Sequence, residues 1–122
     1  MSARKDGSIQ VEFREAGVPG ITRVDITGVV DTGTTLILDE RLAVVLREQQ
    51  YKLVLNLEKV SYVSSAGWGL FISLLHKTRE HNGDIKLAAM TNEVKNVFNL
   101  LAFSNLIYSY KTLEEAVAAF DR

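Results

Sequence analysis

The sequence contains no cysteine and only one proline among its 122 residues. Without cysteine the chain can form no disulfide, thiolate nucleophile or cysteine-ligated zinc site, and this fits a reducing cytoplasm. No segment approaches the run of about 18 apolar residues that a membrane span needs. The opening residues, MSARKDGS, also lack the apolar core of a secretory signal. We therefore expect a cytoplasmic protein with neither a membrane span nor a cleaved export signal.

The chain also lacks an excess of either positive or negative charge. The 14 basic and 15 acidic residues give a formal net charge of −1, and neither sign gathers into a long run. This balance does not favour electrostatic binding of nucleic acid. Hydrophobic residues make up 47% and charged residues 24% of the chain, which is typical of a folded domain. We expect a flexible N-terminus over residues 1–8 and a single domain over residues 9–122.

The apolar pattern begins with a predicted hairpin. Apolar and polar residues alternate over 9–15 and again over 21–27, on either side of a turn that contains Pro19 and Gly20. A polar, glycine-containing loop is expected over 28–35.

Strands and helices alternate after this hairpin. Further strands are predicted over 53–57, 84–89 and 106–110, and helices over 38–49, 64–80, 91–101 and 112–120. The predicted order is therefore ββαβαβαβα. Such alternation implies an α/β fold with a mixed, mostly parallel sheet and right-handed crossovers.

Two serines stand where the central predicted strand meets the following helix. Ser64 and Ser65 fall in the first helical turn, where backbone N–H groups lack intrahelical partners and the helix dipole favours an anion. A phosphate on either hydroxyl would be accommodated there and would add negative charge to the surface. The alternative is that one serine only caps the helix, which is a common role for serine.

Sequence motifs for catalysis are absent. The chain has no Gly-x-Ser-x-Gly elbow, no phosphate-binding loop ending in Gly-Lys-Ser/Thr and no His-Glu-x-x-His helix. His76 and His81 lie on one predicted helix at a spacing that makes them diverge, so they form a poor metal pair. A hydrolase using Ser64 or Ser65 is an alternative, but no sequence feature places a base beside either hydroxyl. We expect no enzyme activity, metal or cofactor.

Trp68, the only tryptophan, lies in the first part of the same predicted helix. A lone tryptophan is more often a core residue than an interface residue, yet aromatic residues are also enriched at binding hot spots. Its closeness to Ser65 favours a place in a binding surface.

These residues carry a resemblance to a known family. The segments LNLE (55–58) and VSYVSSAGWGL (60–70) resemble the signature of STAS domains of the anti-sigma-factor antagonist type, in which an acidic residue precedes the phosphorylated serine. That serine corresponds to Ser65. The loop over 28–31 and the segments from Gly83 onward are also similar, so the resemblance spans about residues 9–120. It implies a STAS fold, with helices packed mainly on one side of the sheet.

The chain departs from the family signature at three positions. Ser64 stands where the family has the acidic residue, Ala66 where it has serine or threonine, and Trp68 where it usually has leucine. Ser64 is therefore a second hydroxyl that could be modified instead of Ser65.

The resemblance implies a function in partner switching rather than catalysis. The unphosphorylated protein would bind an ATP-dependent serine kinase that acts as an anti-sigma factor, and the sigma factor would be released. Phosphorylation of Ser65 would end this binding, and a PP2C-like phosphatase would reverse it. The expected partner-binding residues are Asp31, Thr32, Ser64, Ser65, Ala66, Gly67 and Trp68. The alternative within the fold is a scaffold or transporter-accessory STAS domain in which no serine is phosphorylated.

Overall fold

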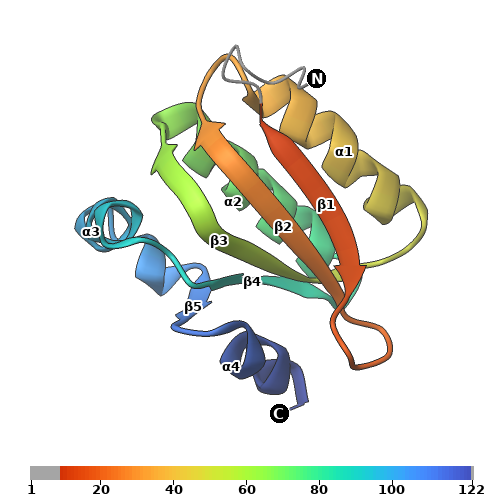
Figure 1. Ribbon diagram of the computed structural model, residues 1–122. Coiled ribbons are helices and arrows are strands. Elements are labelled where there is room, and N and C mark those ends of the chain that lie inside the picture. The colour runs from red at the N-terminus through yellow and green to blue at the C-terminus, as the bar shows by residue number, and fades with distance from the viewer. Residues whose placement is uncertain (1–8, 122) are drawn as a thin grey trace.

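The computed structural model describes residues 9–121 and contains a five-stranded sheet in the order β1-β2-β3-β4-β5 (Figure 1). β1 pairs antiparallel with β2, and the other neighbouring strands pair in parallel. The strands are β1 (Gln10–Glu15), β2 (Thr22–Val30), β3 (Lys52–Val63), β4 (Asp84–Ala88) and β5 (Tyr108–Tyr110). This arrangement confirms the predicted mixed, mostly parallel sheet. The predicted flexible segment 1–8 lies outside the described residues.

Helices connect the parallel strands in the predicted order. The α-helices are α1 (Thr35–Arg47), α2 (Ser65–Arg79), α3 (Asn92–Leu100) and α4 (Leu113–Ala118), with short 3-10 helices η1 (Phe103–Asn105) and η2 (Ala119–Asp121). Thr91 and Thr112 cap α3 and α4 through their hydroxyls, as expected from the sequence. Within residues 9–121 no helix combines the length and apolarity needed to cross a bilayer.

The larger hydrophobic core lies between one face of the sheet and the helices α1, α2 and α3. Leu53, Leu55 and Leu57 of β3 point into this core and are fully buried. Because side chains alternate along a strand, Val54 points to the opposite face. There it packs in a smaller cluster with Ala116 of α4. The helices thus pack mainly on one face, with α4 alone at the lower end of the other (Figure 1).

The central strands are longer than the sequence pattern predicts. The segment 28–30, expected in a loop, belongs to β2, and β3 continues past Leu57 to Val63. The two strands stay paired there, with Gly28 opposite Val60, but the pairing contains register shifts. Such irregularities break the period-two alternation of buried side chains, which explains why the pattern did not reveal these strand ends.

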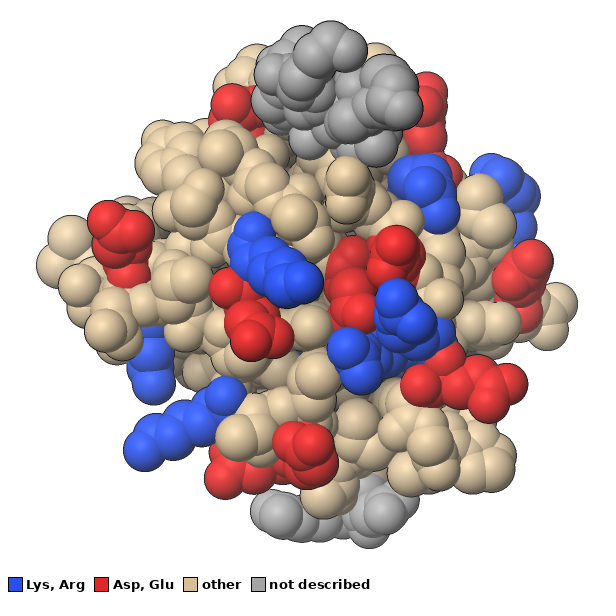
Figure 2. Space-filling view, viewed as in Figure 1, with Lys and Arg blue, Asp and Glu red and all other residues tan. Residues whose placement is uncertain are grey.

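A polar cluster covers part of the sheet face that α4 leaves open. Asp25 accepts hydrogen bonds from Arg14 at 3.0 Å, from Arg23 at 2.8 Å and from the buried Asn56 at 2.9 Å. Acidic and basic side chains are intermixed on this face (Figure 2). Burial raises the pKa of Asp25, but the hydrogen bonds from Arg23, Asn56 and Arg14 outweigh burial and lower it below its usual value.

The Asp25 cluster predicts a loss of stability in acid. Because the folded-state pKa is depressed, the ionised Asp25 stabilises the fold above its unfolded pKa of about 4. That contribution is lost as the pH falls through the folded-state pKa. Urea unfolding from about pH 6 to about pH 3 should show a smaller acid-induced decrease in Asp25→Asn than in the wild type. Asp39→Asn, at an exposed position of α1, is the control and should keep the wild-type slope.

Candidate functional site

The candidate site lies where the adjacent parallel strands β2 and β3 end. Val30 and Val63 are the last residues of these strands and face each other in the register. The backbone N–H of Ser64 donates to the carbonyl oxygen of Val30 at 2.8 Å, which ties the two strand ends together. The loop that begins at Asp31 and the first turn of α2 therefore leave the sheet side by side, as the predicted site requires.

The two serines have different structural roles. Ser64 is the N-cap of α2, with an extended backbone, and its Oγ accepts a hydrogen bond from the N–H of Gly67 at 3.2 Å. Ser65 is the first residue of the helix, and its side chain is exposed. Among the described residues, no hydrogen-bond partner holds the Ser65 hydroxyl. Capping thus accounts for Ser64 and leaves the Ser65 hydroxyl available.

The start of α2 offers a favourable environment for an anion. The N–H groups of Ser65 and Ala66 have no intrahelical acceptor, because the first turn of a helix has no preceding carbonyls. The positive end of the helix dipole lies at the same place. Both residues are exposed, so an anionic group there would contact water as well as the helix end. A phosphate on Ser65 is therefore compatible with the fold.

Asp31 organises the neighbouring loop. Its Oδ1 accepts hydrogen bonds from the N–H groups of Gly33 at 2.9 Å and Thr34 at 3.1 Å. The Thr34 hydroxyl donates to the carbonyl oxygen of Val29 at 2.7 Å and accepts from the N–H of Asp31 at 2.9 Å. Thr32 is exposed at the tip of this turn. The Asp31 carboxylate thus fixes the shape of a loop that presents Thr32 to solvent.

Gly67 lets the first turn of α2 pack against the end of β2. A Cβ atom at this position would lie 2.8 Å from Cγ1 of both Val30 and Val63, and 2.9 Å from the carbonyl oxygen of Val30. Gly67 is buried, so the turn cannot move outward without breaking these contacts. The glycine is required for close approach of the helix rather than for an unusual backbone angle.

We expect Gly67→Ala to destabilise the domain by about 1–3 kcal/mol, as overpacking of a core does, even though alanine favours helix more than glycine. Gly69→Ala is the matched control, because a Cβ at Gly69 meets no atom within 4 Å. That variant should be more stable than the wild type by about 0.5–1 kcal/mol. Urea unfolding of both variants measures the difference, and equal stabilities would contradict the steric role of Gly67.

Trp68 lies in the core and not at the surface of the domain. Its side chain is only 1% exposed and packs against Phe71, Phe98 and Phe103, with ring centroids 5.7, 5.6 and 5.2 Å away. Its Nε1 is buried and has no hydrogen-bond partner among the described residues. The expectation that Trp68 and the buried Gly67 contact a partner directly therefore does not fit the structure. Gly67 instead packs the first turn of α2 against the ends of β2 and β3, and Trp68 packs this helix into the core.

Exposed apolar side chains flank the site and were not identified from the sequence. Leu36 is 67% and Ile37 is 41% exposed in the first turn of α1, directly after the Asp31 loop. Tyr62, two residues before the cap of α2, is 53% exposed. The buried residues of α1 recur at helical spacing from Leu38 onward, and Leu36 and Ile37 do not fit this spacing. That mismatch is the only sequence signal that they face solvent.

His76 lies in α2, whereas His81 lies beyond the end of this helix, so the prediction that both residues share one helix is wrong for His81. His76 and His81 are both exposed, and the ring of His81 stacks on Tyr51 with centroids 4.1 Å apart. Over the part of the chain that the structure describes, no group of three His, Cys, Asp or Glu side chains could hold a metal ion.

Comparison with known proteins assigns the family. The STAS domain profile matches residues 13–116, which is most of the chain. The chain therefore belongs to the STAS domain family. The anti-sigma-B factor antagonist of Bacillus subtilis is 29% identical over 85 residues, covering 70% of this chain and 77% of that protein.

Solved structures share the fold at low sequence identity. An anti-sigma factor antagonist from Mycobacterium paratuberculosis superposes with a TM-score of 0.83 at 20% identity, covering 93% of this chain and 95% of that chain. The unphosphorylated form of the anti-sigma factor antagonist SpoIIAA superposes with a TM-score of 0.74 at 15% identity, covering 92% of this chain and 96% of that chain. SpoIIAA from Bacillus in its phosphorylated form superposes with a TM-score of 0.67 at 14% identity, covering 91% of this chain and 99% of that chain. The predicted STAS fold is thus confirmed.

Proposed function

We propose that this protein is an anti-sigma-factor antagonist controlled by phosphorylation of Ser65. In the unphosphorylated state it binds a serine kinase that sequesters a sigma factor, and the sigma factor is released. The kinase transfers the γ-phosphoryl group of ATP to the Ser65 oxygen, the hydroxyl proton leaves and ADP is formed. Phosphorylated protein dissociates, and a PP2C-like phosphatase hydrolyses the phosphoserine. The protein itself performs no catalysis.

The observation that carries this proposal is the division of roles between the two serines. Ser64 is occupied as the helix cap, while the adjacent Ser65 hydroxyl is exposed at the helix start. A kinase can therefore reach the Ser65 hydroxyl without breaking the cap. Modification of Ser64 would remove a hydrogen bond that helps to begin α2, so Ser65 is the better acceptor.

The proposed contact surface contains fewer of the predicted partner-binding residues than the sequence suggests, because Gly67 and Trp68 are buried. Asp31, Thr32, Ser65 and Ala66 lie at or near the surface, with the partly buried Ser64 between the loop and the helix. The exposed Leu36, Ile37 and Tyr62 would add apolar area beside these polar groups. A mixture of apolar anchors and a polar centre is what a specific protein interface needs.

The departure from the family signature at Ser64 does not favour the scaffold alternative. Serine and aspartate are similarly good N-cap residues, so serine keeps the helix start intact. What the change removes is one negative charge beside the acceptor hydroxyl. The expected consequence is an altered rate of phosphorylation rather than loss of the site.

Reconstitution with the kinase and the sigma factor tests the proposal. Unphosphorylated protein added to the isolated kinase–sigma complex should displace the sigma factor, as seen by size-exclusion chromatography or by fluorescence of labelled sigma. Protein treated beforehand with kinase and ATP should displace little. Equal displacement by both forms would refute the switch, and no displacement by either form would support the scaffold alternative.

A further inference from the structure

Lys86 places a buried cation on the face of the sheet that α4 covers. It lies in β4, its side chain is 8% exposed, and its Nζ lies 3.4 Å from the Asp84 carboxylate. Three aromatic rings surround the same ammonium group, with centroids 4.8 Å away for Tyr108, 5.8 Å for Tyr110 and 4.6 Å for Phe120. A lysine is rarely buried unless its charge is paired. One carboxylate and three rings provide that pairing here.

The ring of Phe120 links this ammonium group to the C-terminal part of the chain. Tyr108 and Tyr110 belong to β5, the strand beside β4, whereas Phe120 lies in η2, directly after α4. The Asp84 carboxylate is also bound by Arg79 at 2.9 Å, so it has a second cationic partner within the domain. The contact between Lys86 and Phe120 is therefore a charge-dependent link between the sheet and the segment that contains α4.

The other contacts that attach α4 are few. The helix has six residues, and among residues 113–120 only Ala116 is fully buried, whereas α2 buries six residues. Ala116 packs over Val54 and Ala88 in the smaller apolar cluster. A helix this short is not stable by itself, so α4 would unfold if it left the sheet.

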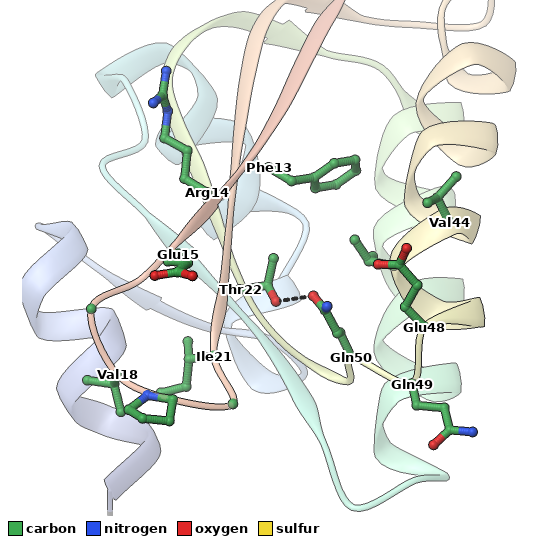
Figure 3. A pocket seen from close by; sticks show the side chains of 14 residues that line it. Phe13, Arg14, Glu15, Val18, Ile21, Thr22, Val44, Glu48, Gln49 and Gln50 are labelled. Carbon is green, nitrogen blue, oxygen red and sulfur yellow. Dashed lines mark hydrogen bonds between the residues drawn. The ribbon is translucent and has the colours of Figure 1, made fainter.

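The surface under α4 is apolar and continues beyond the helix. Val18 and Ile21, at the turn that joins β1 to β2, belong to the same small cluster as Ala116. They also line a groove of about 800 Å³ that extends to the end of α1 (Figure 3). The apolar strip that α4 covers is therefore continuous with a groove that is already open.

We propose that residues 113–121 form a detachable cover over this face of the sheet, and that the charge of Lys86 holds the cover closed. On opening, α4 unfolds and the strip formed by Ile21, Val54 and Ala88 becomes exposed. The remainder of the domain keeps its structure, because its larger core lies on the opposite face. Elements with few buried contacts open at a lower free energy than the core does. Lys86 thus controls access to an apolar surface opposite α1 and α2.

Hydrogen–deuterium exchange followed by NMR tests this cover. In the wild type, the backbone N–H groups of residues 116–118 should exchange at least about tenfold faster than those of α2 and β3. Low concentrations of urea should change the exchange rates of residues 116–118 little, because a local opening exposes little surface. Exchange of 116–118 at the rate of the core would contradict a separate opening.

Variants separate the charge of Lys86 from its packing. Lys86→Met keeps an apolar side chain and removes the charge, so residues 116–118 should exchange about tenfold faster or more, while α2 stays within about twofold of the wild type. Phe120→Leu removes the ring and keeps an apolar contact, so it should have the same selective effect. Lys59→Met, at an exposed position of β3, is the control and should leave the exchange of α4 unchanged.

Two results would overturn the proposal. If residues 116–118 exchange as slowly in Lys86→Met as in the wild type, or more slowly, packing rather than charge holds α4. If Lys86→Met and Phe120→Leu accelerate α2 and α4 equally, the whole domain opens at once and α4 is not a separate cover.

Discussion

Replacing Ser65 with aspartate is expected to weaken binding of the kinase anti-sigma factor about 30-fold to about 150-fold. This range corresponds to an interface penalty of roughly 2–3 kcal/mol from like-charge repulsion and desolvation of the carboxylate. The fold should persist, because a negative charge in the first turn of α2 interacts favourably with the helix dipole, by about 0.3–1 kcal/mol. Isothermal titration calorimetry gives the affinity, and urea unfolding gives the stability.

Ser65→Ala is the matched control for this substitution. It removes the hydroxyl without adding charge, so the protein should bind the kinase with an affinity close to that of the wild type and should not accept phosphate. Ser64→Ala should instead cost about 1 kcal/mol of stability, because it removes the capping oxygen that accepts a hydrogen bond from the N–H of Gly67. If Ser65→Asp binds as tightly as the wild type, the proposed switch is wrong.

The second large effect is expected at Trp68. Truncation to alanine should reduce the free energy of unfolding by about 3–5 kcal/mol, because it empties the space between Phe71, Phe98 and Phe103. Small domains have a total stability of about 5–15 kcal/mol, so this variant loses a large part of it. Urea unfolding followed by circular dichroism measures the change.

Two further variants show whether this effect comes from the core. Tyr62→Ala removes an aromatic ring that is 53% exposed and should change stability by less than about 0.5 kcal/mol. Trp68→Phe keeps most of the packing and should bind the kinase with nearly wild-type affinity, because Trp68 does not reach the surface. Loss of binding in a stably folded Trp68→Phe variant would place Trp68 in the interface and contradict its assigned role.

The order of elements could be predicted from sequence because its signals are local. Alternating apolar residues identify β1, and a threonine followed by helical spacing identifies the starts of α3 and α4. The position of the serines at a helix start was predictable for the same reason. Which serine caps and which is free was decided by the backbone of Ser64, which is extended, and by the hydrogen bond from Gly67 to its hydroxyl.

Other features depend on contacts between distant segments and had no local signal. The bulged pairing of β2 with β3 hides the strand ends, because Val60 and Val63 are buried although the residues between them are exposed. The burial of Trp68 depends on Phe98 and Phe103, about thirty residues away in sequence. Gly67 was assigned to the partner surface for its place in the motif, whereas its buried contact with Val30 is visible only in three dimensions.

The most direct test of the Ser65 switch is intact-mass spectrometry of the protein purified from its own cells, with phosphatases inhibited throughout. Fragmentation then locates any added phosphoryl group. One phosphoryl group is expected on Ser65 in part of the population, and none in a Ser65→Ala strain. A protein that stays unmodified under these conditions, or that carries its phosphate on Ser64, would contradict the assignment of Ser65 as the switch.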